Sequence, residues 1–154
     1  MESSRPKELA TRKPELFKEG VQTYHGSCHC GAVKFEVDLD LQYAKTNRCN
    51  CSFCAKARQW GIVVKPEQFR LVAGADNLSV YRFGSKSGDH CSCKTCAIKT
   101  HGTGYVEQLG GAFVGAIIAC IDDLSEEQKD SLIYSHSNGK DDLWWEEPKF
   151  KNHL

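Results

Sequence analysis

Eight of the nine cysteines in this chain of 154 residues fall into three short clusters. The clusters are Cys28-His29-Cys30, Cys49-Asn50-Cys51-Ser52-Phe53-Cys54 and Cys91-Ser92-Cys93-Lys94-Thr95-Cys96. They are so far apart in the sequence that only a folded chain brings them together. Without a secretory signal, such clusters are better explained by metal than by disulfides, because zinc prefers thiolate ligands and cytosolic thiols stay reduced. We therefore predict a zinc protein.

Length and charge narrow the class of protein. A chain of 154 residues can bury one hydrophobic core but not two independent ones. The chain has 20 Lys and Arg residues and 20 Asp and Glu residues, so its formal net charge is zero. Because nucleic-acid-binding proteins usually carry a positive surface, we expect no nucleic-acid partner. The longest apolar run, 112–121, is too short to span a bilayer, and the first residues lack the apolar segment of a signal peptide. We expect no membrane partner and a cytoplasmic location.

Residues 1–20 mix charges with Pro6 and Pro14 and contain few apolar positions. We predict that they form a mobile N-terminal arm that contributes little to the core. A single zinc-binding catalytic domain is predicted over residues 21–154.

The apolar pattern within this domain favours strands. Val33, Phe35 and Val37 alternate with charged residues, which is the period of a strand with one buried face. Further strands are predicted at 43–48, 60–64, 69–73, 78–83, 98–101 and 112–121, and one short helix near the C-terminus at 123–134. The fold class is therefore mainly β.

The clusters differ in how many ligands they offer. A Cys-x-Cys and a Cys-x-x-Cys together supply four thiolates, which is the closed coordination of a structural zinc ion. The cluster from Cys49 to Cys54 supplies three and leaves one position open, as in catalytic sites. Three thiolates around one Zn²⁺ leave a net negative charge, which makes the metal a weak Lewis acid. Such a centre suits the binding and deprotonation of a thiol substrate.

Two other arrangements would close the open position. In the first, Cys91 is the fourth ligand, because Cys91 and Cys93 lie two apart on a strand and point to the same face. In the second, a nearby histidine is the fourth ligand, and the candidates are His25, His29, His90 and His101. Both arrangements leave zinc sites that only stabilise the fold. Cys120, alone in an apolar run, is expected to be a small buried apolar residue.

The residues that flank the clusters make the pattern specific. The chain reads Gly26-Ser27-Cys28-His29-Cys30-Gly31-Ala32-Val33-Lys34-Phe35, then Cys49-Asn50-Cys51-Ser52-Phe53-Cys54, then Cys93-Lys94-Thr95-Cys96. These segments resemble the glutathione-dependent formaldehyde-activating enzyme family, which also includes centromere protein V. The resemblance runs from about Tyr24 to Leu124 and into residues 138–144. It implies a mainly β, Mss4-like fold with two zinc ions, one structural and one catalytic.

The resemblance also implies roles for single residues. By that resemblance the structural zinc ligands are Cys28, Cys30, Cys93 and Cys96, and the catalytic ones are Cys49, Cys51 and Cys54. The implied reaction joins glutathione and formaldehyde to S-hydroxymethylglutathione, which is a carbon–sulfur lyase reaction run backwards. A thiolate adds to the aldehyde carbon, and a protein group then protonates the alkoxide. His101 and Tyr105 are candidates for that proton donor.

Two positions depart from the family pattern. Ala97 stands where the family usually has glycine, which costs about 1 to 2 kcal/mol if this residue is left-handed. Basic residues often follow the central cluster in the family, whereas this chain continues with Ala55-Lys56-Ala57-Arg58. Lys56 and Arg58 are the candidates for binding the carboxylates of glutathione.

Two other functions fit the same cysteines. The metal could activate water, which would give a thiol-independent hydrolase of a small carbonyl or imine compound. The chain could instead be a non-catalytic interaction domain that zinc stabilises. Its neutral net charge and the absence of a long basic tail argue against this function. The oligomeric state stays open.

Overall fold

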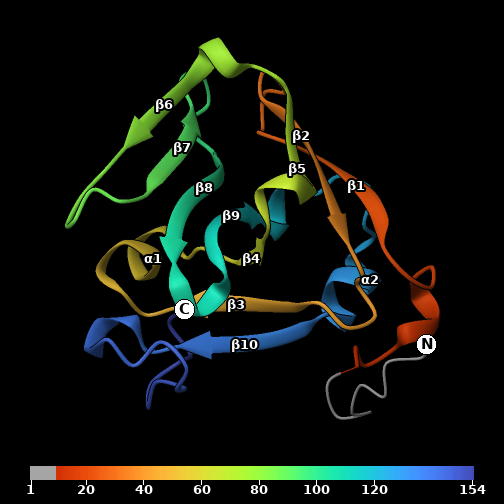
Figure 1. Cartoon of the computed structure of the whole chain (residues 1–154). Coiled ribbons are helices and arrows are strands. Elements are labelled where there is room, and N and C mark those ends of the chain that lie inside the picture. Colours follow the sequence, from red (N-terminus) through yellow and green to blue (C-terminus); the bar gives the residue numbers. More distant parts are fainter. Residues whose placement is uncertain (1–9) are drawn as a thin grey trace.

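The computed structural model describes residues 10–154, which form two β-sheets (Figure 1). The smaller sheet is antiparallel and has the order β1-β2-β5, with bounds β1 (Gln22–Ser27), β2 (Lys34–Leu39) and β5 (Phe69–Ala73). The larger sheet has the order β10-β3-β4-β9-β8-β7-β6. Its bounds are β10 (Ile133–Ser137), β3 (Lys45–Cys49), β4 (Gly61–Val64), β9 (Gly111–Ile117), β8 (Lys99–Val106), β7 (Asp89–Cys93) and β6 (Leu78–Tyr81). The prediction of a mainly β fold is confirmed.

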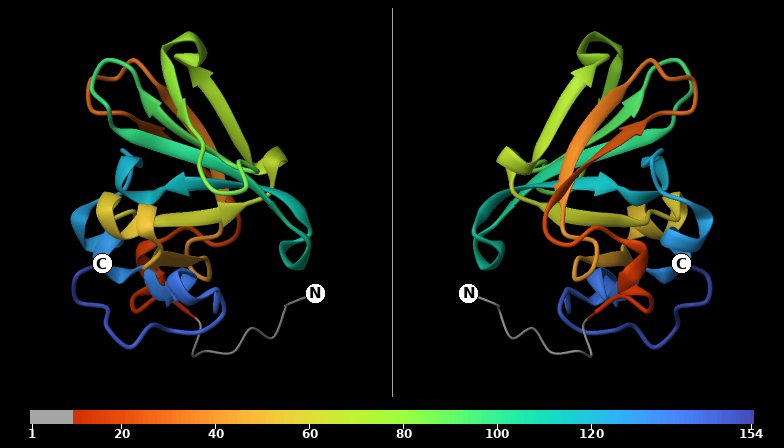
Figure 2. Two further views of the ribbon diagram at one scale, coloured as in Figure 1. Left: turned by 90° about the vertical axis from the view of Figure 1, so that its left-hand side faces the viewer. Right: turned by 90° about the vertical axis from the view of Figure 1, so that its right-hand side faces the viewer.

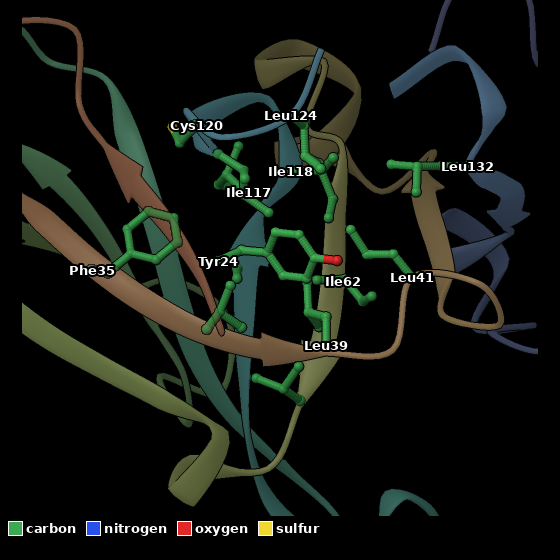
Figure 3. Close-up of a cluster of buried hydrophobic side chains, with 14 of the residues drawn as sticks. Tyr24, Phe35, Leu39, Leu41, Ile62, Ile117, Ile118, Cys120, Leu124 and Leu132 are labelled. Carbon is green, nitrogen blue, oxygen red and sulfur yellow. The ribbon is translucent and has the colours of Figure 1, made fainter. Parts of the chain in front are cut away.

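The main hydrophobic core lies where the small sheet crosses the large one (Figure 2). Figure 3 shows Tyr24 of the small sheet in the middle of this core, with Ile62 and Ile117 of the large sheet around it. Phe35 and Val37 of β2 are almost fully buried, at 1% and 0% exposure. The alternation of apolar and charged residues along β2 therefore turns one face of this strand into the core, as the sequence predicts.

Two strand pairings bring the cysteine clusters into place. β10 pairs in parallel with β3, and Ser137 lies opposite Cys49 at the ends of both strands. The loop after β10 therefore reaches the central cluster. β7 pairs with β8, with a shift of register between Cys91 and Ser92. The turn after Cys93, which contains Cys96, leads directly into β8.

The described residues include two short helices, α1 (Ser52–Ala57) and α2 (Glu126–Ser131), whereas the sequence pattern predicts only the second. α1 has six residues, which is too short for a helical period to show in the sequence. α2 begins after Ser125, whose side chain accepts a hydrogen bond from the backbone N–H of Gln128 in a capping box. No helix within residues 10–154 combines the length and the apolar character that crossing a membrane requires.

Two expectations about the chain are wrong. Phe17 is 5% exposed and belongs to the main core, and Thr11 is also buried, so part of the predicted N-terminal arm contributes to the core. Residues 1–9 of that arm lie outside the described residues. The apolar run 112–121 is not one strand, because β9 gives way to a 3₁₀ turn at Ile118–Cys120.

Candidate metal centres and active site

Four cysteines from two distant segments meet beside a small satellite core. The sulfur atoms of Cys28, Cys30, Cys93 and Cys96 all lie within 4.8 Å of one another. Sγ of Cys30 is 3.7 Å from Sγ of Cys28 and 3.6 Å from Sγ of Cys93. A tetrahedron with zinc–sulfur bonds of about 2.3 Å has sulfur–sulfur edges of about 3.8 Å, so these residues fit a zinc ion. Cys28 and Cys93 are buried against Val33, which ties this site to the fold.

The two turns that carry these cysteines aim backbone N–H groups at sulfur. The N–H of Val33 donates to Sγ of Cys28, and the N–H of Thr95 donates to Sγ of Cys93, each at 3.3 Å. Backbone hydrogen bonds also lower the pKa of Cys96 to about 6, which favours the thiolate. Gly31 and Ala97 close the turns with φ of +82° and +64°. Ala97 therefore occupies the left-handed conformation that favours glycine.

The central cluster brings three thiols together. Sγ atoms of Cys49, Cys51 and Cys54 lie within 4.8 Å of one another, where β3 ends and α1 begins. The sulfur of Cys51 caps α1 by accepting a hydrogen bond from the N–H of Cys54 at 3.4 Å, and the N–H of Cys51 donates to Sγ of Cys49 at 3.3 Å. The spacing of the cluster is therefore set by a strand end and one helical turn.

These three thiols cannot ionise independently. Hydrogen bonds with Cys49 and Cys54 lower the pKa of Cys51, whereas hydrogen bonds with Cys49 and Cys51 raise the pKa of Cys54. Negative charge on one sulfur thus opposes ionisation of the next. A divalent cation among them would remove this conflict, so the donor set fits a zinc ion held by three thiolates.

The central cluster has no fourth ligand among the described residues. Within residues 10–154, the group of mutually close ligand atoms contains the three cysteines, without Cys91 and without any of the four candidate histidines. His25 instead contacts Asp123, with its Nδ1 atom 2.9 Å from Oδ2. Cys91 is buried within β7. The two arrangements that would close the open position are therefore not the ones observed.

A loop after β10 covers the central cluster. Asn50, between two of the thiols, donates to Oδ1 of Asn138 at 2.9 Å and accepts from the N–H of Lys140 at 3.0 Å. Gly139 packs between Sγ of Cys49 and the ring of Trp144. Trp144 and Trp145 are 46% and 69% exposed, so they do not cover the edge of a hydrophobic core. The ring of Trp144 packs against Gly139 instead, close to Sγ of Cys49.

A cavity of about 600 Å³ opens beside this loop. Asn50 and Ser52, which flank thiols of the central cluster, form part of its wall. Three lysines line it: Lys56, Lys140 and Lys149. His153 and one acidic residue, Asp141, also line it, so the charged side chains of the lining carry a net positive charge. Lys140 and Lys149 have no local motif in the sequence that marks them as site residues, and only the fold places them next to Lys56.

Arg58 lies in a different place from Lys56. It ends α1 in the left-handed conformation, with φ of +49°, and lines a second cavity of about 530 Å³. That cavity also includes Trp60 and Lys99 and borders the first metal site at Cys28. The two residues predicted to bind glutathione therefore line different cavities, because the turn at the end of α1 separates Lys56 from Arg58.

The two candidate proton donors are also in unsuitable places. His101 is 6% exposed, and its ring is tilted against that of Phe69 with the centroids 4.7 Å apart. It also makes a hydrogen bond with Thr100. Burial lowers its pKa to about 4. Tyr105 is 62% exposed near the end of β8. Neither residue lines either of the two cavities.

Comparisons with known proteins agree with the geometry of the cysteines. The family model for "Glutathione-dependent formaldehyde-activating enzyme" matches residues 23–137. A curated relative from Halomonas elongata, named "Putative glutathione-dependent formaldehyde-activating enzyme", is 38% identical over 80 residues. That match covers 47% of this chain and 50% of the relative, so the chain spans about half the length of that relative.

A solved structure of a Rhodobacter sphaeroides protein has a similar fold. It superposes with a TM-score of 0.60 at 32% identity, and the match covers 72% of this chain and 99% of that one. The family match includes all three cysteine clusters. The chain therefore belongs to the glutathione-dependent formaldehyde-activating enzyme family.

Proposed function

We propose that this protein is a zinc-dependent enzyme that joins glutathione and formaldehyde to S-hydroxymethylglutathione, or cleaves that adduct. The observation that supports this most directly is a cluster of three thiols without a fourth ligand from the described residues, next to a cavity lined by lysines. The reaction class is that of a carbon–sulfur lyase. We assign two zinc ions, a structural one to Cys28, Cys30, Cys93 and Cys96 and a catalytic one to Cys49, Cys51 and Cys54.

A zinc ion at the central cluster would supply an open coordination position and lower the pKa of a thiol that binds there. The chain contributes the geometry around this position. Backbone N–H groups of Cys51 and Cys54 stabilise the thiolates, and the hydrogen bonds of Asn50 hold the covering loop in place. A thiol substrate that reaches the cluster is therefore held in a fixed orientation, which favours its addition to an aldehyde.

The cavity lined by three lysines suits the carboxylate groups of glutathione. This tripeptide carries two carboxylates at some distance from its thiol, and lysines bind carboxylates by charge-assisted hydrogen bonds. Lys56 and Lys140 line the same cavity as Asn50, which lies between two thiols of the central cluster. We therefore assign the binding of the carboxylates to Lys56, Lys140 and Lys149, while Arg58 is left out of this set.

The grouping of seven cysteines as possible metal ligands fits a reducing compartment. All nine cysteines are free, and none forms a disulfide. We accordingly place the reaction in the cytoplasm, where thiols stay reduced.

The direct test measures the exchange of ¹³C-formaldehyde with glutathione by NMR, since the adduct also forms without an enzyme and only the rate is informative. Wild-type protein is expected to accelerate the exchange, and Cys54→Ser is expected to lose this acceleration. Lys34→Met is the control, because Lys34 is exposed on β2 and belongs to neither of the two ligand groups. Equal activity of Cys54→Ser and wild type would refute the proposal, and turnover of a carbonyl compound without thiol would favour the hydrolase instead.

A further inference from the structure

Lys99 carries a partly buried ammonium group toward the central cluster. It lies at the start of β8, and its Nζ atom is 2.7 Å from Nδ1 of His90 and 2.5 Å from Oε1 of Gln59. The same atom is 4.8 Å from the ring centroid of Phe53, the residue just before Cys54. Phe53 and His90 stack at 4.0 Å, so three side chains enclose this ammonium group.

The backbone on both sides fixes the position of this lysine. Lys99 follows the turn of the first metal site, and its carbonyl oxygen accepts a hydrogen bond from Sγ of Cys120 at 3.3 Å. Gln59 follows α1, and its N–H donates to the carbonyl oxygen of Cys54 at 3.2 Å. Lys99 therefore connects the segment that carries one cysteine site to the segment that carries the other.

The charge of Lys99 lacks a carboxylate partner. Among the described residues, no Asp or Glu oxygen forms an ion pair with it. A buried ammonium without a counter-charge is costly. The negative groups that act on Lys99 are thiolates, with Cys54 first. Cys91 also contributes, but burial raises the pKa of its thiol, so that it is neutral near pH 7.

The thiolates of the central cluster are therefore the counter-charge. Three thiolates and one Zn²⁺ leave a net charge of minus one, which a single ammonium group neutralises. A buried cation that is hydrogen-bonded only to neutral groups and faces a reactive centre is a candidate for a role in the chemistry. It also fills a gap, because the mechanism needs a proton donor and neither His101 nor Tyr105 is suitably placed.

We propose that Lys99 is the general acid of the addition, a role that rests on the proposed function. The thiol releases its proton to water, and the thiolate sulfur forms a bond to the aldehyde carbon. The π electrons of the carbonyl group move to oxygen and give an alkoxide. The Lys99 ammonium donates its proton to this alkoxide, and the resulting amine takes a proton from water. Thiol and aldehyde are thus converted to the hydroxymethyl thioether without a net change in protons.

The surroundings of Lys99 suit this role near neutral pH. Burial lowers its pKa to about 8, against the opposing effect of the thiolates. The titratable groups that face it are His90 and Cys91 from β7 and Cys51 and Cys54 at α1. His29, Arg58 and Asp122 line the second cavity together with Lys99. Since the acid must be protonated, activity should fall as pH rises through the pKa of Lys99.

The experiment compares wild type with Lys99→Met and Lys99→Arg in the ¹³C-formaldehyde exchange assay, each loaded with zinc. Lys99→Met is expected to lower the exchange rate by about 100-fold or more and to abolish the fall in rate above about pH 8. Lys99→Arg keeps the charge but holds its proton too tightly to donate it. It should therefore stay as slow as Lys99→Met. Lys34→Met, an exposed lysine on β2, is the control.

A second readout does not depend on turnover. The ¹³Cε resonance of Lys99 in the zinc-loaded protein should titrate near pH 8 and should move when glutathione is added. A titration above pH 10, no response to glutathione, or full activity of Lys99→Arg would overturn the assignment. If wild-type protein does not accelerate the exchange, the proposed function fails and the role of Lys99 fails with it. If wild type is active and Lys99→Met is equally active, only the role of Lys99 fails.

Discussion

Gly139 lies directly against the sulfur of Cys49. A Cβ atom on residue 139 would be 2.7 Å from this sulfur and 2.6 Å from Cη2 of Trp144. The loop after β10 can therefore cover the central cluster only because its residue at this position lacks a side chain. Since both neighbours belong to the site, any shift that relieves the overlap changes the site itself.

Gly139→Ala should therefore weaken the central metal site while the fold persists. The added methyl group displaces the sulfur of Cys49 or the ring of Trp144, and zinc ligation requires sulfur positions within a few tenths of an ångström. We expect zinc content to fall from two ions toward one per chain, measured by elemental analysis after dialysis. Gly115→Ala in β9 is the matched control, because nothing lies within 4 Å of the position that its Cβ would take. Two retained zinc ions in Gly139→Ala would contradict this reading of the loop.

The two cysteine sites should differ in their effect on stability. Cys28 and Cys93 are buried in the satellite core, so the binding free energy of zinc at this site is part of the free energy of folding. Cys93→Ser should abolish the cooperative thermal transition, whereas Cys54→Ser should retain it with a modest fall in Tm. Calorimetry of both variants tests the contrast. The division into a structural and a catalytic site would be wrong if Cys93→Ser unfolded cooperatively near the wild-type Tm.

At the two left-handed positions of the first metal site, substitutions should change the free energy of unfolding in opposite directions. Ala97 has φ of +64°, and glycine would relieve a strain of about 1 to 2 kcal/mol, less a loss of about 0.4 to 1 kcal/mol from the greater freedom of the unfolded chain. Ala97→Gly should thus raise the free energy of unfolding by about 0.5 to 1 kcal/mol in urea titrations. Gly31→Ala, with φ of +82° and no atom within 4 Å of the added Cβ, should lower it by about 1 kcal/mol. If Gly31→Ala raised the free energy of unfolding, the left-handed φ angles would not determine the stability of these turns.

The lysines of the larger cavity should determine the affinity for glutathione. Reversing the charge in Lys56→Glu or Lys140→Glu should raise the KM for glutathione by about tenfold or more, because a charge-assisted hydrogen bond contributes about 1.5 to 3 kcal/mol. The KM for 2-mercaptoethanol, a thiol without carboxylates, should stay the same. Arg58→Glu is the comparison, since Arg58 lines the other cavity. An equal effect of Arg58→Glu on the KM for glutathione would show that the substrate occupies the second cavity.

Much of the fold could be predicted from the sequence, because the patterns that determine its strands and turns involve residues close together in the chain. The alternation along β2 and the turn residues Gly74 to Asn77 act within a few positions, and strands β5 and β6 occur where such patterns predict them. Phe17 could not be predicted to be buried, because its partners come from residues far along the chain. The same holds for the parallel pairing of β10 with β3, since parallel pairing leaves no short-range signal.

In the candidate site, too, only features that depend on nearby residues could be predicted from the sequence. The spacing of the cysteines is a local signal, and it groups the thiols as the structure does. Lys56 and Arg58 are neighbours in the sequence, yet a left-handed residue at the end of α1 directs them to different cavities. Lys99 stands next to a cysteine turn without any motif of its own. Its proximity to the central cluster depends on the pairing of β7 with β8 and on the end of α1.

The most direct test of the central claim is the absorption spectrum of the cobalt-substituted protein before and after addition of glutathione. Thiolate-to-cobalt charge-transfer bands report how many sulfur atoms surround each metal ion. If the cluster of Cys49, Cys51 and Cys54 has an open position for a thiol, the bands gain intensity with glutathione, and Cys91→Ala behaves as wild type does. An unchanged spectrum would show that glutathione does not bind the metal, and the account of this site as a thiol-activating centre would be wrong.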